Sequence, residues 1–404
     1  MSKARTPQLT VLVAADWAPI RAFEPLVRAD PAAVYGDLLP LLRRADLRIV
    51  NCECALTRAD RPVWKSGAVF KGEPEHVHGL AVVPFEVACL ANNHVLDYGV
   101  PGFRESLRVL RRAGIRTVGA GLTEDQAYAP LTCRVNGVPV HVVNFSEGED
   151  LTASRSGPGV FGWDIPRVQA LVRRCKKQGG VVIAIGHCGL EYVPYPPPYV
   201  VSAFRAIVDA GADAVIGHHP HVPQGIEWYG GRPILYSLGN FVFYQPTALH
   251  YRKVGFAVTL QIDGRAVSGI ELHPYRITDT GLRTLEAKED REFRRRLAAV
   301  SRPFTTPGGP ERAWGAYLAY YGLEGFTKEV LTILDRMRTE PQKGAAMFRN
   351  RVTTMQHAEL WRDCLTLIIE KGRRRPLQSE RATVEEWFSR TVDAAGPSLT
   401  ASAG

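Results

Sequence analysis

The sequence has few cysteines and no long apolar run. Its seven cysteines are scattered and odd in number, which argues against a disulfide framework and favours reduced thiols. No segment approaches the ~20 apolar residues of a membrane helix. The first residues, MSKARTPQLTVLVAAD, lack the apolar stretch and small-residue cleavage site of a signal peptide. These absences predict a cytoplasmic protein with no membrane partner.

A basic stripe interleaved with aromatic residues is also missing. The formal charge is +9, but the arginines are scattered along the 404 residues, so nucleic-acid binding is not expected. Such a charge suits acidic small molecules or acidic polymers without choosing between them. Hydrophobic residues make up 45% of the chain, enough for a sizeable core, and there are no internal repeats.

Short β-branched runs alternate with helical patterns over the first two thirds of the chain. We predict strands at residues 9–14, 47–51, 87–91, 117–119, 138–145, 181–186, 214–217 and 234–237, and helices at 31–44, 102–113, 165–178 and 200–210. Glycines at 114, 179 and 211 stand just past three of these helices, where helices commonly stop. This order predicts a mostly parallel, helix-covered sheet.

The pattern changes toward the C-terminus. Segments 254–260 and 267–272 resemble a hairpin with DGRA (263–266) as its turn. Beyond about residue 280 strand signals vanish, and we predict helices at 288–300, 311–321, 328–338, 342–371 and 383–390 before a frayed Ser/Ala/Gly-rich tail. We therefore divide the chain into a domain at 1–285 and a helical extension at 286–404.

Five polar clusters each follow an apolar, strand-like run. They are ADW around Asp16, NCECA around Glu53, ANNHVLDYG at 91–99, GHCGLEY at 186–192 and GHHPH at 217–221. Open α/β sheets place their sites at the carboxyl ends of their strands. Five such clusters in succession predict a metal centre at that edge.

The acidic and amide residues have both functional and structural interpretations. Asp16 is a carboxylate that needs a cation or donors if it is buried, but a turn or helix-cap role is equally natural. Asn51 and Glu53 are two apart and share one face of a strand. The third cluster supplies ligands and a general acid or base, although an Asn-rich turn before the next helix is the alternative; its polar residues are Asn92, Asn93, His94 and Asp97.

The remaining clusters supply imidazoles. His187 and Glu191 follow VVIAI, and His219 and His221 follow AVI two residues apart, so that an extended segment would turn both rings the same way. Such a pair is a common way to hold one metal or two adjacent metals, and His218 is expected behind it. Mixed nitrogen and oxygen ligands suit Mn, Fe or Zn better than Ca. Cys52 and Cys54 are expected in the core rather than on the metal.

The motifs resemble the CapA family of poly-γ-glutamate and capsule biosynthesis proteins, within the calcineurin-like metallophosphoesterases. The similarity spans about residues 9–275 and is carried by LANNHVLDYG, the GAG at 119–121, HCGLEYVPYPPP, GADAVIGHHPHVPQGIE and ILYSLGNFVF. It implies an α/β fold, a four-layer α/β/β/α metallophosphoesterase-like sandwich, here with a C-terminal helical extension. It also implies a centre for one or two divalent metal ions.

The resemblance assigns roles position by position. Metal ligands would be Asp16, Glu53 as a bridge, Asn93, His187, His219 and His221. His94 would protonate a leaving group or bind an anionic group of the substrate, and we group Asp97 and Glu191 with it as catalytic candidates. Residues behind the ligands or near the substrate would be Asn51, Asn92, His218 and Asn240.

The sequence also departs from the superfamily pattern. Ala18 stands where a metal-binding His is usual in the first motif, Ala15 replaces a usual Gly, and Cys188 stands where Trp or Tyr is usual. The missing His predicts a weakly held first metal or a single-metal centre. The membrane anchor usual in the family is not expected here, which argues against a role in capsule export.

Three functions fit these observations. The first is a metal-dependent hydrolase, or a transferase or ligase, acting on a phosphoryl or acyl group of an acidic or γ-glutamyl-type substrate. The second is a cytoplasmic tailoring enzyme that forms an amide bond in small-molecule biosynthesis. The third is a non-catalytic accessory subunit of a polymer or amide synthetase. The C-terminal helices would then dock a synthetase partner or form a homo-oligomer.

Overall fold

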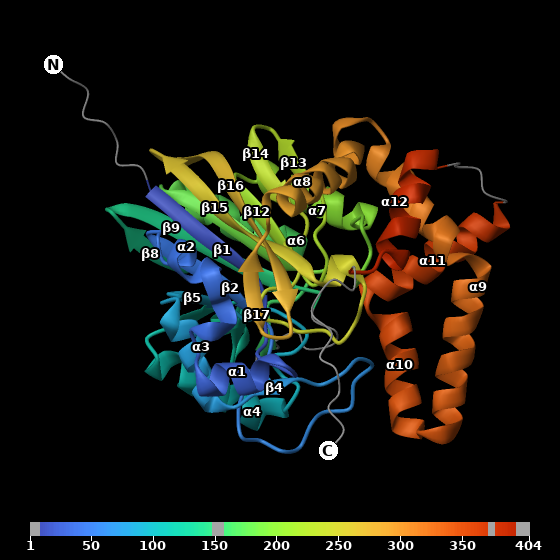
Figure 1. The fold of residues 1–404 in the computed structure, drawn as a ribbon, viewed down its shortest axis with the longest axis horizontal. Helices are drawn as coiled ribbons and strands as arrows, with labels where there is room; N and C mark the ends of the chain where they lie inside the picture. Colours follow the sequence, from blue (N-terminus) through green and yellow to red (C-terminus); the bar gives the residue numbers. More distant parts are fainter. Residues whose placement is uncertain (1–8, 148–156, 371–375, 393–404) are drawn as a thin grey trace.

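Two β-sheets form the centre of the computed structural model, which describes residues 9–147, 157–370 and 376–392 (Figure 1). The first sheet has the order β17-β16-β15-β1-β2-β5-β6 and the second β13-β14-β12-β11-β9-β8. The first contains β1 (Leu9–Trp17), β2 (Leu47–Cys52), β5 (Val87–Cys89), β6 (Arg116–Val118), β15 (Val254–Asp263), β16 (Ala266–Thr278) and β17 (Gly281–Thr284). The second contains β8 (Leu131–Val135), β9 (Val138–Ser146), β11 (Val181–His187), β12 (Ala214–His218), β13 (Ile226–Tyr229) and β14 (Arg232–Leu235).

Both sheets are mixed rather than mostly parallel. Strands β1, β2, β5 and β6 are parallel, and so are β9, β11, β12 and β14. Antiparallel strands β15, β16 and β17 extend the first sheet, while β8 and β13 form antiparallel edges of the second. The predicted hairpin at 254–272 is confirmed as β15 and β16. Two short strand pairs, β3 (Ala55–Leu56) with β4 (Lys71–Gly72) and β7 (Ala120–Gly121) with β10 (Gly159–Val160), lie apart from the sheets.

Strand β11 shows how the layers are built. Val181, Ile183 and Ile185 pack in one hydrophobic cluster with residues of the first sheet, whereas Val182 and Ala184 pack beneath helices α6 (Ile165–Lys177) and α7 (Pro198–Asp209). Because side chains alternate along a strand, His187 continues the series that faces the first sheet. Helices α1 (Phe23–Ala29), α3 (Val77–Val82) and α4 (Gly99–Arg112) accompany the first sheet. The four-layer α/β/β/α sandwich implied by the resemblance is therefore confirmed.

The predicted helix at 31–44 is wrong. Its residues form a 3₁₀ segment, Ala33–Leu38, and one short helix, α2 (Leu39–Leu42), because the backbone turns at Gly36 with a φ of 51°. A Cβ atom at Gly36 would lie 2.1 Å from the carbonyl oxygen of Leu282. Strand β17 therefore passes too close for a continuous helix. Neither β17 nor α1 was indicated by the sequence patterns.

Helices dominate after residue 286, as predicted. They are α8 (Ala287–Ser301), α9 (Gly309–Thr339), α10 (Pro341–Thr353), α11 (Met355–Ile369) and α12 (Gln378–Ser389). Two predicted helices merge into α9, which is kinked at Gly322, and the predicted helix at 342–371 divides at Thr354. Helices α10, α11 and α12 pack on α9, beside the sandwich (Figure 1). Within the described ranges no helix combines the length and apolar character needed to span a bilayer. The predicted frayed tail lies largely outside the described residues.

Candidate metal centre

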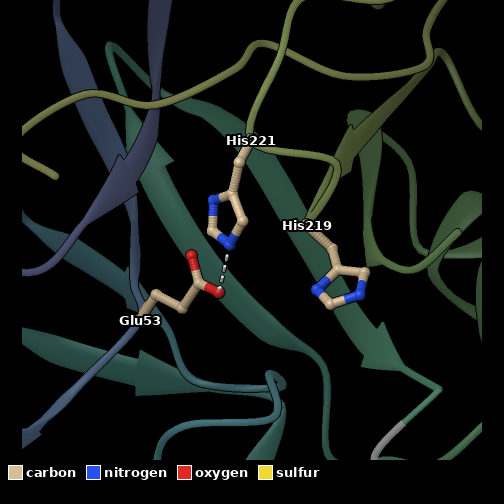
Figure 2. A group of neighbouring side chains, drawn as sticks. All are labelled: Glu53, His219 and His221. Carbon is tan, nitrogen blue, oxygen red and sulfur yellow. Dashed lines mark ion pairs between the residues drawn. The ribbon is translucent and has the colours of Figure 1, made fainter. Parts of the chain in front are cut away.

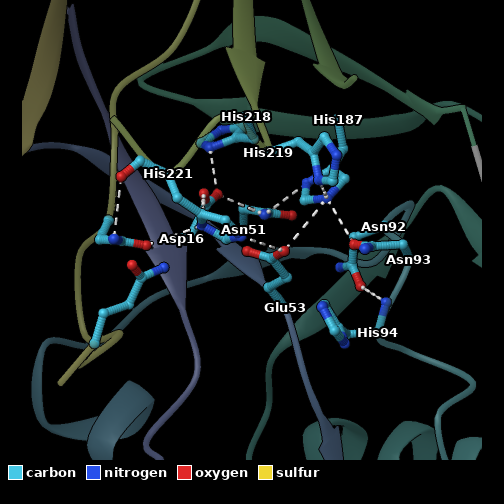
Figure 3. A network of polar contacts seen from close by, with 12 residues as sticks. Asp16, Asn51, Glu53, Asn92, Asn93, His94, His187, His218, His219 and His221 are labelled. Atoms are coloured by element: carbon cyan, nitrogen blue, oxygen red, sulfur yellow. Dashed lines mark hydrogen bonds and ion pairs between the residues drawn. The ribbon is translucent and has the colours of Figure 1, made fainter. Parts of the chain in front are cut away.

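The five polar clusters of the sequence meet at the carboxyl ends of strands from both sheets (Figure 3). β1 and β2 bring the two acids, the turn after β5 brings an amide and an imidazole, and β11 and β12 bring the remaining imidazoles. Each side chain is at most 4% exposed, and the set comprises Asp16, Glu53, Asn93, His94, His187, His219 and His221. Such burial is costly for polar groups unless they bind partners or a metal.

Three potential ligand atoms surround the Nε2 atom of His187, which is itself a fourth. The Oδ1 atom of Asn93 lies 3.0 Å from it, Nδ1 of His219 lies 3.1 Å away, and Oε1 of Glu53 lies 3.4 Å away. Two ligands about 2.1 Å from one ion have separations of this size. This cluster, which we call the His187 side, has the donor number and spacing of a metal site.

The opposite side of the centre is built around Asp16. Its Oδ1 atom accepts a hydrogen bond from Nδ2 of Asn51 at 2.8 Å and lies 3.0 Å from Nδ1 of His218. Its Oδ2 atom is 3.3 Å from Nδ1 of His221. Burial alone would raise the pKa of Asp16, but the contacts with His218 and His221 bring it well below the ordinary value. Asp16 is therefore ionised, with partners supplied by the chain. We call this cluster the Asp16 side.

Glu53 lies between the two sides. Its Oε1 atom is 3.4 Å from His187 and 3.6 Å from Nε2 of His221, and Figure 2 shows the imidazoles of His219 and His221 turned toward its carboxylate. Neither carboxylate oxygen has a hydrogen-bond partner among the described residues. Burial, followed by the charges of Asp16 and Glu191, raises the pKa of Glu53 well above the ordinary value. A carboxylate so placed would be stabilised by a bound cation.

The histidines after β12 reach Glu53 by an unusual backbone path. His219 and His221 have φ values of 98° and 55°, in the left-handed region that residues other than glycine seldom adopt. The prediction that both rings face the same way along an extended segment is therefore wrong in its geometry. The rings converge because the backbone turns on both sides of Pro220. Strain of this kind concentrates at functional sites.

The chemistry of the donors fits a divalent metal. Glu53 belongs to two groups of potential ligands, one with His219 and His221 and one with Asp16 and His187. Buried polar atoms without a hydrogen-bond partner among the described residues cluster here, namely Asp16 Oδ2, Asn51 Oδ1, both oxygens of Glu53 and His218 Nε2. Nitrogen and oxygen ligands of this kind suit Mn, Fe or Zn. Glu53 is common to both groups of potential ligands.

A second polar chain positions His94 beside the centre. Its Nδ1 atom lies 2.7 Å from Oδ2 of Asp97, which also accepts a hydrogen bond from the backbone N–H of Phe70. Lys65 donates to the other oxygen of Asp97 at 3.0 Å and to the carbonyl of Asn93 at 2.6 Å. Burial opposes ionisation of Asp97, but the charges of His94 and Lys65 lower its pKa below the ordinary value. Asp97 thus orients His94, whereas His94 itself faces the pocket.

A pocket of about 260 Å³ opens beside Asn93, His94 and His221. Glu191 lines this pocket and is solvent-exposed. Two further lining residues are cationic. The guanidinium of Arg252 lies 3.5 Å above the ring of Tyr192, and that of Arg21 lies 5.2 Å from the ring of Phe70.

Neither guanidinium pairs with a carboxylate in the part of the chain that the structure describes. The sequence patterns did not indicate Lys65, Arg21 or Arg252. They lie in a loop, a turn or a short 3₁₀ segment, with no spacing that marks them.

The other predicted residues support this arrangement. The Oδ1 atom of Asn240 lies 2.9 Å from Nδ1 of His221, and its Nδ2 atom donates to the His221 carbonyl at 3.1 Å. Asn92 donates to the carbonyl of Cys52 and accepts from the backbone N–H of His94, so it fixes the turn. Cys52 and Cys54 are buried and free, as predicted.

Comparison with known proteins gives the family. A sequence model described as "Bacterial capsule synthesis protein PGA_cap" matches residues 8–245, which is more than half of the chain. The chain belongs to this family. Its match covers every strand-end cluster and stops before the helical region. The CapA resemblance read from the motifs is thereby confirmed.

Named relatives agree with this family. The PGA biosynthesis protein CapA of Bacillus subtilis is 34% identical over 222 residues, covering 53% of this chain and 57% of that protein. The capsule biosynthesis protein CapA of Bacillus anthracis is 31% identical over 221 residues, covering 52% and 54%. A probable polyglutamine synthesis accessory protein of Mycobacterium tuberculosis is 29% identical over 292 residues, covering 67% and 77%. The chain thus matches just over half of the length of the two Bacillus relatives.

Proposed function

We propose that this CapA-like protein is a metal-dependent enzyme that cleaves or transfers a phosphoryl or acyl group of an acidic, γ-glutamyl-type substrate. The observation that carries this proposal is the convergence of Asn93, His187, His219 and Glu53 beside a pocket with an oriented imidazole. The Glu53 carboxylate has no hydrogen-bond partner among the described residues. A purely structural polar cluster would satisfy its buried carboxylate.

The ligands would be divided between the two sides. Asn93, His187 and His219 would hold one ion on the His187 side, Asp16 and His221 would hold a second, and Glu53 would bridge them. A bound divalent ion polarises the scissile oxygen and lowers the pKa of bound water. Ala18, in place of the usual His, leaves the Asp16 side with fewer ligands.

His94 would supply the proton for the leaving group. Its Nδ1 atom is directed to the ionised Asp97 and its ring lines the pocket, so that its Nε2 atom would address a substrate there. The ammonium of Lys65 and the N–H of Phe70 keep Asp97 in place. A positioned general acid of this kind contributes about 10²–10⁴-fold to a rate.

The pocket wall would select an anionic substrate. Arg21 donates to the carbonyl of Tyr244 at 2.8 Å, and Arg252 stacks on Tyr192, so both guanidiniums are held in position while charge remains available. Carboxylates and phosphates are the groups that guanidinium binds best. An acidic substrate would place its charged group here and its scissile bond over the metal centre.

An accessory role is the second candidate. It is favoured by Ala18 and by the Mycobacterium tuberculosis relative, whose name describes an accessory protein. In that case the centre would bind metal without turnover, and the helical region would dock on a synthetase or on a second copy of the chain.

The test combines metal content with turnover. Purified full-length protein is supplied with Mn²⁺ and assayed on p-nitrophenyl phosphate and on γ-glutamyl p-nitroanilide, beside the His94→Gln variant. We expect one to two ions per chain in both proteins. Turnover on one substrate should fall about 10²–10⁴-fold in the variant because the proton donor is removed.

The control is His273→Gln, a histidine of β16 that is remote from the polar clusters of the centre in sequence and bonds to Thr259. Its turnover should equal that of the unmodified chain. Bound metal without turnover on either substrate would favour the accessory role. Absence of bound metal would contradict both the centre and the proposal.

A further inference from the structure

Gln356 of the helical region reaches the metal centre. Gln356 is the second residue of α11, 2% exposed, and its Nε2 atom lies 3.3 Å from Nε2 of His219. The family match ends at residue 245, so Gln356 stands outside the part of the chain that the family defines. A buried polar side chain from a separate element thus contacts a candidate metal ligand.

The two nitrogens of the His219 ring face different groups. Nδ1 lies 3.1 Å from Nε2 of His187, on the His187 side, whereas Nε2 faces Gln356. A neutral imidazole that ligates a metal through Nδ1 carries its proton on Nε2. The group opposite Nε2 must then accept a hydrogen bond.

Gln356 has such an acceptor. The oxygen and nitrogen of a side-chain amide exchange places on rotation by half a turn, and their assignment follows from the hydrogen-bond network. With Oε1 turned to His219, the amide accepts the Nε2 proton and leaves the lone pair of Nδ1 directed at Glu53 and His187. Partners of this kind orient metal-ligating histidines in proteins.

The helical region also contacts the loop that contains Lys65 and Gly67. Lys343 of α10 donates to the carbonyls of Lys65 at 3.1 Å and Gly67 at 2.8 Å. Lys65 is the residue that holds Asp97 and the Asn93 carbonyl. Gln356 of α11 therefore holds this region against the metal centre, and Lys343 of α10 holds it against the loop whose Lys65 supports Asp97.

We infer that Gln356 is a positioning residue of the metal centre: its amide oxygen holds His219 in the orientation and tautomer that bind metal. The helical region is then part of the centre. This inference rests on the proposed function, because it needs a metal on the His187 side. The inference goes beyond the proposed function because it assigns a role to the helical region, which lies outside the family match.

The experiment measures metal affinity instead of activity. Chelator-stripped full-length protein is titrated with Mn²⁺ and with Zn²⁺ in competition with a chromophoric chelator. Gln356→Leu, which removes the acceptor, should weaken the tightest site about 10–100-fold. Gln356→Glu, which keeps an acceptor, should restore the affinity to that of the unmodified chain or exceed it.

Controls separate this role from packing. Gln342→Leu removes an exposed amide from α10 and should leave the affinity unchanged. Circular dichroism and thermal unfolding of the metal-free proteins establish that each variant folds. Equal affinity in Gln356→Leu and the unmodified chain would overturn the inference. So would a Gln356→Glu variant as weak as Gln356→Leu, since that outcome indicates packing alone.

A second measurement needs no variant at position 356. In histidine-labelled, Zn²⁺-loaded protein, ¹⁵N shifts assigned with His219→Ala should show His219 protonated on Nε2. Protonation on Nδ1 would overturn the inference while leaving the metal centre intact. If the unmodified chain binds neither metal, the proposed centre fails, and the role of Gln356 fails with it.

Discussion

Asp16 and Glu53 are two buried carboxylates of one centre, yet the chain treats them differently. Asp16 has Asn51 and His218 as hydrogen-bonding neighbours, and its pKa lies well below the ordinary value despite burial. Glu53 has no hydrogen-bond partner for either oxygen among the described residues, and burial raises its pKa. The protein stabilises one acid itself and leaves the other for a ligand.

The same asymmetry extends to the ligands around each acid. On the His187 side three neighbouring atoms lie within 3.4 Å of one nitrogen. On the Asp16 side the protein's own donors already occupy one oxygen, and Ala18 takes the place of the usual His. We therefore expect two binding steps, a tight one at the His187 side and a weaker one at the Asp16 side.

The largest effect should follow from Glu53→Gln, which removes the residue common to both sides. Without its charge neither ion is held, so metal content should fall below half an ion per chain by elemental analysis. Any turnover should drop at least about 10³-fold, because the metal's contribution to the transition state is lost.

A neighbouring control shows that the effect is local. Glu191→Gln changes an acid that lines the pocket and should keep the full metal content. If Glu53→Gln retains two ions, the carboxylate is not shared between them. The contrast between Asp16, which has hydrogen-bond donors from the chain, and Glu53, which has none among the described residues, would then be contradicted.

A paired substitution distinguishes the two sides. His187→Ala should weaken the tight step about 100-fold or more, whereas Asp16→Ala should abolish only the weak step and change the tight one by less than about tenfold. The reason is that His187 contacts three of the potential ligands, while Asp16 contacts the centre mainly through His221. Isothermal titration with Mn²⁺ measures both steps, and equal losses in the two variants would contradict the asymmetry.

The convergence of the candidate ligands could be predicted from the sequence because each follows an apolar strand. Asn93 and His187 were expected at one edge on this ground, since the carboxyl ends of parallel strands meet there; their roles as ligands stay predictions. The backbone reversal at His219 and His221 was not predictable, because histidine is more frequent than most residues at positive φ but does not require it. The sequence patterns also predicted one sheet where the structure has two large ones, and only the family resemblance indicated two.

Contacts that depend on loop and helix placement lay beyond the sequence patterns. Gln356 is a polar residue at the start of a helix, and nothing in the neighbouring sequence indicates that α11 begins beside His219. Lys65 lies in a loop with no periodicity, yet it supports Asp97. Gly36 interrupts a helical pattern only because Leu282 of a distant strand approaches it.

The smallest effect should appear in the stability of the metal-free protein. Glu53→Gln should raise the free energy of unfolding at pH 7 by about 1 kcal/mol, because it removes an unsatisfied buried acid beside ionised Asp16. Asp16→Asn should lower it by about 1–3 kcal/mol, because it breaks charge-assisted contacts with Asn51 and His218. Urea unfolding of chelator-treated proteins provides both values.

The pH dependence of that stability carries the comparison further. Folded Glu53 keeps its proton to a higher pH than the unfolded chain does, so metal-free stability should fall as pH rises from the ordinary Glu pKa toward the folded one. Glu53→Gln should remove this slope. The folded pKa of Asp16 is lowered, so its contribution should be complete at pH 7 and be lost only below the ordinary Asp pKa. Identical pH profiles for the two variants would show that the two acids share one environment.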